Sequence, residues 1–135
     1  MILIDSNIII ALFDSNDVHH KKAVSLLKAI GEQRVYTLSV NLLEIYSVIA
    51  RRCRERKYDC RTALEQLRML ETNLNIIWVE NQKTIHDEIV DKIIETKGKI
   101  NYIDAIILKY CLDNNAVLKS FDKNLISEYE TVRKN

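Results

Sequence analysis

The chain has 135 residues, 47% of them hydrophobic, which suffices for the core of one ordinary domain but not of two, so we expect a single domain over residues 1–135. With 20 basic and 19 acidic residues the formal net charge is +1, which excludes a global field that would attract nucleic acid or a membrane. Charges interrupt every apolar stretch before about 18 residues, and the N-terminus lacks signal-peptide features, so we expect an unprocessed chain without a membrane partner.

The N-terminal part of the chain changes from a strand pattern to a helical one. Residues 2–4 are apolar, rich in β-branched side chains and followed by a polar turn, which predicts a buried strand that ends at Asp5. Apolar residues then recur with helical spacing over residues 8–12 and 23–30. Gly31 is placed to end the second of these helices.

A second strand and two further helices are expected next. Residues 35–38 predict the strand, and Ser39 is placed to cap a helix over about residues 40–56. That helix begins almost wholly apolar and ends basic, so we expect its start to be buried and its end to be solvated. Asp59 opens another helix, whose inward side chains are expected to be Leu64, Leu67, Met69 and Leu70.

The same alternation continues to the C-terminus. Residues 75–79 predict a strand, 82–97 a helix, 102–113 a strongly apolar helix, 116–118 a strand and 131–132 a possible last strand. Inward side chains of the first of these helices are expected to be Ile85, Ile89, Ile93 and Ile94. Alternation of strands and helices predicts an α/β fold, with a central parallel sheet of about five strands covered on both faces.

Four carboxylates stand in apolar surroundings, where an isolated charge costs several kcal/mol. They are Asp5, Glu44, Asp104 and Asp122. Asp5 and Asp122 follow predicted strands, and binding sites of open parallel sheets form at the carboxyl ends of the strands. A shared hard divalent cation, bound by oxygen ligands, would compensate all four charges together.

Each acid also has a simpler interpretation on its own. Asp5 can be the N-cap of the first helix, and Asp122 can cap a turn through Asn124 and Leu125. Asp104 can complete a capping box three residues after Asn101. Glu44 is harder to explain in this way, because its helix has little polar face there, although a pairing with an arginine at the edge of the core is possible.

A cluster of this kind supports metal-assisted hydrolysis of phosphodiesters. One or two Mg²⁺ or Mn²⁺ ions can activate water for in-line attack and neutralise the leaving oxygen, and the carboxylates hold the metal, so no nucleophilic serine, cysteine or histidine is required. Ser6, Asn7 and Ser120 flank the acids and can orient carboxylates or waters, though all three are also ordinary turn residues.

These residues occur in motifs that resemble the PIN-domain family over essentially the whole chain. Hydrophobic residues precede Asp5, Ser6 and Asn7, a mid-chain acid follows in residues 42–45, and residues 101–108 and 118–125 give the later motifs in family order. The length also resembles that of VapC-type toxins.

The resemblance implies a Mg²⁺- or Mn²⁺-dependent ribonuclease with an acidic quartet and a three-layer α/β/α sandwich. Asp5, Glu44, Asp104 and Asp122 would then be both catalytic and metal-binding. It also implies a cytoplasmic homodimer and, in toxin members, a small antitoxin partner. Asn124 stands where many relatives have another acid, which would weaken a second metal site. Asn124 would then support the metal ligands without being one. Ser120 replaces the commoner threonine.

The basic end of the helix over residues 40–56 can attract the RNA backbone without sequence preference. The candidate contacts are Arg51, Arg52, Arg54 and Arg56. The alternative is a solvated helix end, because cations stabilise helix C-termini. Neither the three histidines nor the three cysteines have zinc-site spacing, and the odd number of cysteines favours a reducing compartment.

The sequence therefore predicts a divalent-metal endoribonuclease that cleaves single-stranded RNA, most simply as the toxin of a type II toxin–antitoxin pair. Two alternatives stay open. One is a PIN nuclease of housekeeping RNA processing, and the other is a binding module that keeps the fold without activity. Dinucleotide binding is excluded, because Gly31 and Gly98 are the only glycines.

Overall fold

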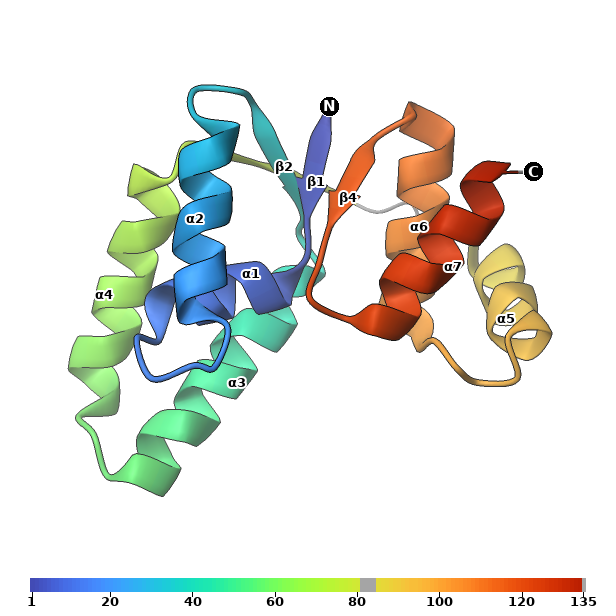
Figure 1. Ribbon diagram of the computed structural model, residues 1–135. Helices are drawn as coiled ribbons and strands as arrows, with labels where there is room; N and C mark the ends of the chain where they lie inside the picture. Colours follow the sequence, from blue (N-terminus) through green and yellow to red (C-terminus); the bar gives the residue numbers. More distant parts are fainter. Residues whose placement is uncertain (81–84, 135) are drawn as a thin grey trace.

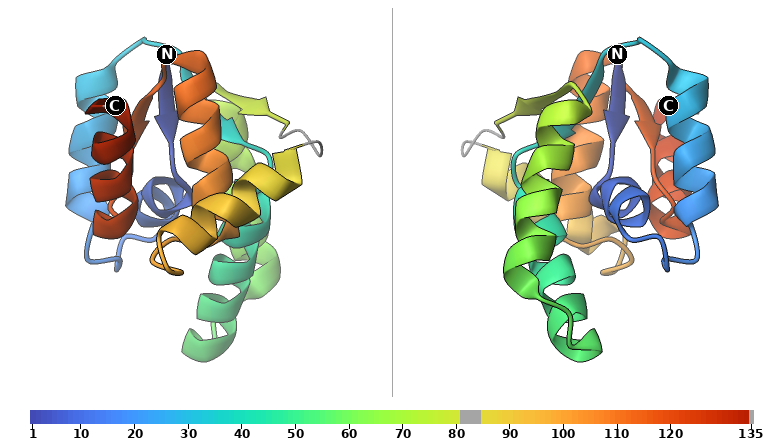
Figure 2. Two further views of the ribbon diagram at one scale, coloured as in Figure 1. Left: turned by 90° about the vertical axis from the view of Figure 1, so that its right-hand side faces the viewer. Right: turned by 90° about the vertical axis from the view of Figure 1, so that its left-hand side faces the viewer.

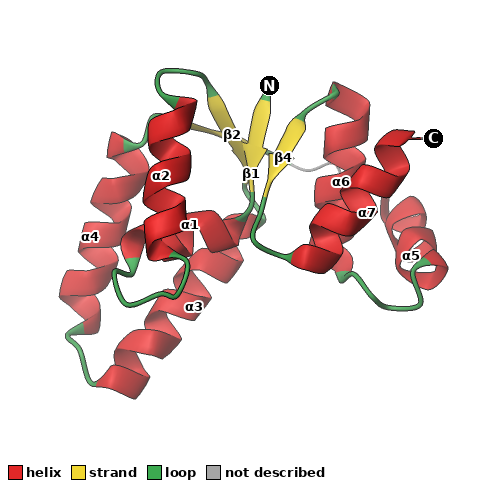
Figure 3. Ribbon diagram, viewed as in Figure 1, coloured by secondary structure: helices red, strands yellow, loops and turns green. Residues whose placement is uncertain are grey.

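The computed structural model describes residues 1–80 and 85–134, and its centre is a parallel β-sheet (Figures 1 and 3). The sheet has four strands, in the spatial order β3-β2-β1-β4. Their bounds are β1 (Ile2–Ile4), β2 (Val35–Leu38), β3 (Ile76–Val79) and β4 (Val117–Lys119). All three pairings are parallel, and β1 lies between β2 and β4, with Leu3 opposite Tyr36 of β2 and Leu118 of β4.

Helices cover both faces of this sheet, as the two side views of Figure 2 show. On one face lie α1 (Ser6–Phe13), α2 (His20–Ile30), α3 (Asn41–Arg56) and α4 (Cys60–Asn73). The other face carries α5 (His86–Glu95), α6 (Tyr102–Asn114) and α7 (Lys123–Lys134). Successive strand residues point to opposite faces, so Leu3 packs with the second group of helices and Ile4 with the first. The predicted α/β/α sandwich is confirmed.

Most of the predicted helix ends are confirmed as well. Gly31 is the C-cap of α2 with φ of +63°, a left-handed conformation that glycine adopts without steric cost. Asp59 is the N-cap of α4 and accepts a hydrogen bond from the Arg61 backbone N–H. The prediction for Ser39 is wrong, because Val40 is the N-cap of α3 and makes no side-chain cap. Instead the Ser39 N–H donates to the Val79 carbonyl at 2.8 Å and continues the contact between β2 and β3.

The predicted fifth strand at residues 131–132 is wrong, because these residues belong to α7. Leu125 and Tyr129 are buried at helical spacing, and the Tyr129 hydroxyl donates to the Ala116 carbonyl beside β4. Met69 and Ile94 are also not inward, with 63% and 67% of their surfaces exposed.

The predicted helix over 82–97 is described as α5, and residues 82–84 lie outside the described part of the chain. None of the described helices is both long and apolar enough to cross a membrane.

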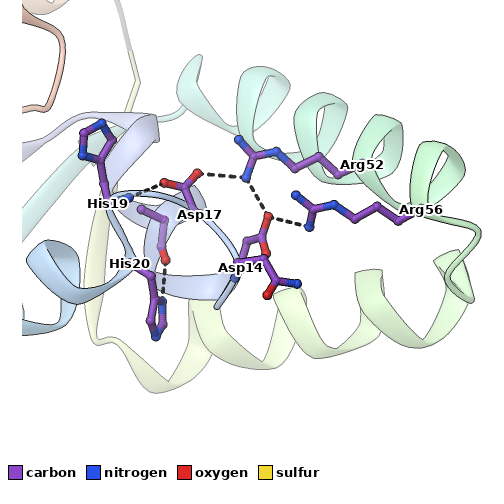
Figure 4. A network of polar contacts seen from close by, with 8 residues as sticks. Asp14, Asp17, His19, His20, Arg52 and Arg56 are labelled. Carbon is purple, nitrogen blue, oxygen red and sulfur yellow. Dashed lines mark hydrogen bonds and ion pairs between the residues drawn. The ribbon is translucent and has the colours of Figure 1, made fainter.

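An ion-pair network fixes the loop between α1 and α2 to α3 (Figure 4). Nη1 of Arg52 lies 2.7 Å from a carboxylate oxygen of Asp14 and 2.9 Å from one of Asp17, and Nη1 of Arg56 lies 2.9 Å from Asp14. Burial alone would raise the pKa of Asp14, but hydrogen bonds from Arg56, the Asn16 backbone and Arg52 hold it below its usual value. Two of the four arginines predicted to bind RNA are therefore occupied within the protein.

Candidate active site

The four acids singled out in the sequence lie at one edge of the sheet. Asp5 directly follows β1, and Asp122 lies between β4 and α7. Glu44 and Asp104 are in the first turns of α3 and α6. In Figure 1 the N-terminal ends of α1, α3, α6 and α7 all lie at the lower edge of the sheet, where the strands end. The doubly wound topology thus brings together residues that are far apart in the sequence.

Asp5 is the most buried of these acids, with 5% of its surface exposed. Its Oδ1 accepts a hydrogen bond from the Ser6 backbone N–H at 2.7 Å, and its Oδ2 accepts one from the Ser120 hydroxyl at 2.8 Å. Asp5 is the N-cap of α1, so the simpler interpretation of this residue is confirmed. That role uses part of the carboxylate and does not explain a hydroxyl contributed from 115 positions later in the chain.

Ser120 and Asn7 connect the two sequence segments that carry Asp5 and Asp122. The Asn7 side-chain amide donates to Ser120 Oγ at 3.1 Å and accepts from the Phe121 backbone N–H at 3.2 Å. Ser120 Oγ also accepts from the Asp122 backbone N–H at 3.0 Å. These bonds restrain the side chain of Asp5 and the backbone at Asp122.

The other two short-range interpretations are also confirmed, and each leaves an oxygen atom unused. Asp104 forms a capping box with Asn101 through its Oδ2, and Asp122 Oδ1 accepts from the backbone N–H groups of Asn124 and Leu125. Among the described residues, nothing donates a hydrogen bond to Asp104 Oδ1, to Asp122 Oδ2 or to the Glu44 carboxylate. Three of the four acids therefore have oxygen atoms available to a ligand.

The pKa values of Asp104 and Asp5 are raised. Burial is the main reason that the pKa of Asp104 is raised to about 6; a backbone hydrogen bond from Asn101 lowers it, and the charges of Asp5, Asp122 and Glu44 raise it. Burial likewise raises the pKa of Asp5, with a contribution from Glu44 against the hydrogen bonds from Ser120 and Ser6. Within the described part of the chain no lysine or arginine forms an ion pair with any of the four. The edge therefore carries uncompensated negative charge.

The donor set fits a hard divalent cation, although the protein alone does not form a closed cage. No three His, Cys, Asp or Glu side chains in residues 1–80 and 85–134 are close enough together to enclose a metal ion. Mg²⁺ retains several of its waters and is usually held by one or two carboxylates, so a closed cage is not required. Open carboxylate oxygens without a positive partner are the arrangement such an ion would neutralise.

A buried amide near Glu44 was not identified from the sequence. Asn41 is fully buried in the first turn of α3, and its Nδ2 donates to Thr37 Oγ1, which in turn donates to the Ile4 carbonyl next to Asp5. Its Oδ1 has no hydrogen-bond partner among the described residues. Asn41 precedes Glu44 by three positions and so lies on the same side of the helix. A buried polar group without a partner is unusual, and a polar residue inside the apolar run was the signal that could have revealed it.

Comparison with known proteins decides the family. The family model of the PIN domain matches residues 2–130, nearly the whole chain. The chain belongs to the PIN-domain family. The fold of this PIN-domain protein is similar to that of the Mycobacterium tuberculosis toxin VapC20, described as a sarcin–ricin loop cleaving toxin. The two share 15% sequence identity with a TM-score of 0.77, and the match covers 95% of each chain. No curated protein matches the PIN-domain chain. Family membership supports a nuclease, a hydrolase of phosphodiester bonds.

Proposed function

We propose that this PIN-domain protein, taken as one domain over residues 1–135, is a divalent-metal-dependent endoribonuclease acting on single-stranded RNA. The observation that carries the proposal is the gathering of four carboxylates at one edge of the sheet, with open oxygen atoms and no cationic partner among the described residues. Such an arrangement is costly for folding alone, and a bound metal removes the cost. The presence of all four acids favours an active enzyme over a binding module without activity.

In this proposal Asp5, Glu44, Asp104 and Asp122 hold the metal and are the catalytic residues. A bound Mg²⁺ or Mn²⁺ ion supplies an activated water and neutralises charge on the phosphodiester. Ser120 holds Asp5 in one rotamer through its 2.8 Å hydrogen bond, and Asn7 and Ser6 support that arrangement. The Asn124 backbone N–H orients Asp122.

VapC20 is described as a toxin that cleaves the sarcin–ricin loop, which supports the more specific role of a toxin with an RNA substrate. As the resemblance to VapC-type toxins implies, we also propose a small antitoxin partner and a homodimeric state. Arg51 and Arg54 lie exposed on α3, and we propose them as RNA contacts of this helix. A housekeeping RNA-processing nuclease remains the second candidate, because the fold and the acids would be the same. An adjacent small reading frame that encodes a DNA-binding N-terminal segment would favour the toxin.

The direct test is cleavage of a labelled single-stranded RNA by the metal-stripped protein with and without added Mg²⁺ or Mn²⁺. We expect cleavage only with metal, and its loss when a chelator is added. Calorimetric titration with Mn²⁺ is the companion measurement. An absence of binding at about millimolar metal would favour the inactive module, because oxygen-ligand sites for a hard divalent cation such as Ca²⁺ have dissociation constants of up to about 1 mM.

Metal affinity should fall in acid. A carboxyl group must lose its proton to bind the ion, and Asp104 has a pKa of about 6 without metal. At about pH 7.5 it is ionised, whereas at about pH 5 a proton competes with the metal, which corresponds to roughly tenfold weaker binding. Calorimetry with Mn²⁺ at both pH values measures the change. The Asp104→Asn variant should show a weaker dependence on pH, and an equal dependence in both proteins would contradict the role of Asp104.

A further inference from the structure

A groove with a basic wall lies beside the acids. It has a volume of about 520 Å³ and runs between α2 and the segment that joins β4 to α7. Lys21 and Lys22 of α2 line one side, Lys119 at the end of β4 lines the other, and Ser120 and Phe121 continue the lining toward the acids. Neither the sequence motifs nor the family match assigns a role to these lysines.

The three lysines are not neutralised within the protein. In the described parts of the chain, the ion pairs do not include Lys21, Lys22 or Lys119. Arg52 and Arg56, by contrast, are paired with Asp14 and Asp17 on another part of the surface. Lys21 and Lys22 of α2 and Lys119 of β4 are therefore free to meet a ligand in this groove.

The placement of Lys21 and Lys22 is unfavourable for the helix itself. Both lie in the first turn of α2, which contains no acidic residue, and the N-terminal end of a helix carries partial positive charge. Folding alone would favour aspartate or glutamate there. Residues that are unfavourable for their own helix are expected at functional sites. A negatively charged ligand would offset the repulsion between these lysines and the helix N-terminus.

The groove is continuous with the candidate active site. Ser120 and Phe121 line both the groove and a neighbouring hollow of about 310 Å³, whose charged lining residues are Asp122, Lys123 and Glu130. The Ser120 hydroxyl is itself the donor to Asp5 at 2.8 Å. A polyanion that follows the lysines would thus arrive at the carboxylates, where its phosphate can be cleaved.

We propose that this groove binds the backbone of the RNA strand on one side of the cleaved bond, with Lys21, Lys22 and Lys119 as phosphate contacts. The proposal rests on the proposed nuclease function and names its substrate-binding surface. Phosphate contacts from lysine confer affinity without sequence preference.

The test compares two double variants with the same change in charge. Lys21→Glu with Lys22→Glu changes the groove, and glutamate suits the first turn of α2, so folding is preserved. Arg34→Glu with Lys134→Glu is the control: both residues are exposed, Arg34 directly precedes β2 and Lys134 ends α7 at the opposite edge of the sheet. Binding of a fluorescent single-stranded RNA is measured by anisotropy at several salt concentrations, in an Asp5→Asn background that prevents cleavage.

We expect the groove variant to bind RNA at least about tenfold more weakly than the control, with the salt slope reduced by about 0.7 for each lost contact. In active protein the same pair of substitutions should raise KM and leave kcat nearly unchanged. Equal binding by both variants, or equal loss in both, would overturn the groove. So would normal RNA binding combined with lost binding of an acidic peptide, since the occupant would then be a protein.

Failure of the two proposals is distinguishable. If the unmodified protein does not cleave RNA with any metal, the nuclease is wrong, yet the anisotropy comparison still decides whether the groove binds RNA. If the protein cleaves RNA and the groove variant matches the control, the nuclease stands and the groove assignment is wrong.

Discussion

Replacing Asp104 with asparagine is expected to abolish RNA cleavage and to make the metal-free protein more stable. Loss of one metal-holding carboxylate should cost several kcal/mol of transition-state stabilisation, or about 10³-fold in kcat. The capping box survives, because the asparagine Oδ1 can accept the Asn101 N–H as Asp104 does now. Activity and stability thus change in opposite directions, which is the expected behaviour of a residue kept for function.

The sign of the stability change follows from the raised pKa of Asp104. At a pH below the usual value of 3.8 the carboxyl is protonated in both the folded and the unfolded chain and has no effect. Between 3.8 and about 6 the unfolded chain ionises first, so the folded state loses stability, and above about 6 the loss is complete. Because Asp104 is partly exposed, screening reduces the gain from asparagine at about pH 7.5 to the order of 1 kcal/mol.

Thermal and urea unfolding of the metal-free protein measure this gain, and gel assays measure cleavage. Asp113→Asn at the exposed end of the same helix is the matched control, because it removes a charge without touching the site. Asp5→Asn should lose cleavage to a similar extent. Cleavage by both Asp5→Asn and Asp104→Asn at the unmodified rate would refute the site assignment.

Arg52→Met is expected to destabilise the protein by about 2 kcal/mol and to leave the chemistry of cleavage intact. The change removes the partner of Asp17 and one of two partners of Asp14, whose side chains are 11% and 9% exposed. Breaking a buried pair costs about 3–5 kcal/mol, and we discount this because Arg52 is itself 25% exposed and Arg56 still contacts Asp14. Methionine keeps the apolar stem of the side chain in place.

Urea unfolding followed by circular dichroism measures the effect. Arg51→Met is the control: its side chain is 54% exposed and lies 3.9 Å from Glu55, so its removal should change stability by less than about 0.5 kcal/mol. Equal stability of the two variants would show that the network in Figure 4 contributes nothing to the fold.

Patterns that depend on neighbours in sequence predicted most of this structure. The β1 strand and the helix that became α6 were identified because burial and periodicity act over a few residues. The last predicted strand failed, since Val132 is β-branched but follows Leu125 and Tyr129 at helical spacing. The helical spacing of apolar residues along α7 outweighed the preference of Thr131 and Val132 for a strand.

The acids were found from the sequence because a charge inside an apolar run is a local signal. The sequence did not show which basic residues are free, because a lysine or arginine with an ion-pair partner in the fold looks the same in the sequence as one without. Arg52 was predicted to bind RNA, and only the folded chain shows that Asp14 and Asp17, more than 30 positions earlier, already hold it. The orphaned oxygen of Asn41 was equally invisible before folding.

The hydrogen bond from Ser120 to Asp5 has a consequence for shortened chains. The first strand carries the most buried acid, and the hydroxyl that orients it comes from the segment after the last strand. A chain cut after α6 lacks β4, Ser120 and Asp122, and β1 then has one edge unpaired. Such a fragment would keep Asp5 but not the partner that orients it, so the proposed metal site would be incomplete.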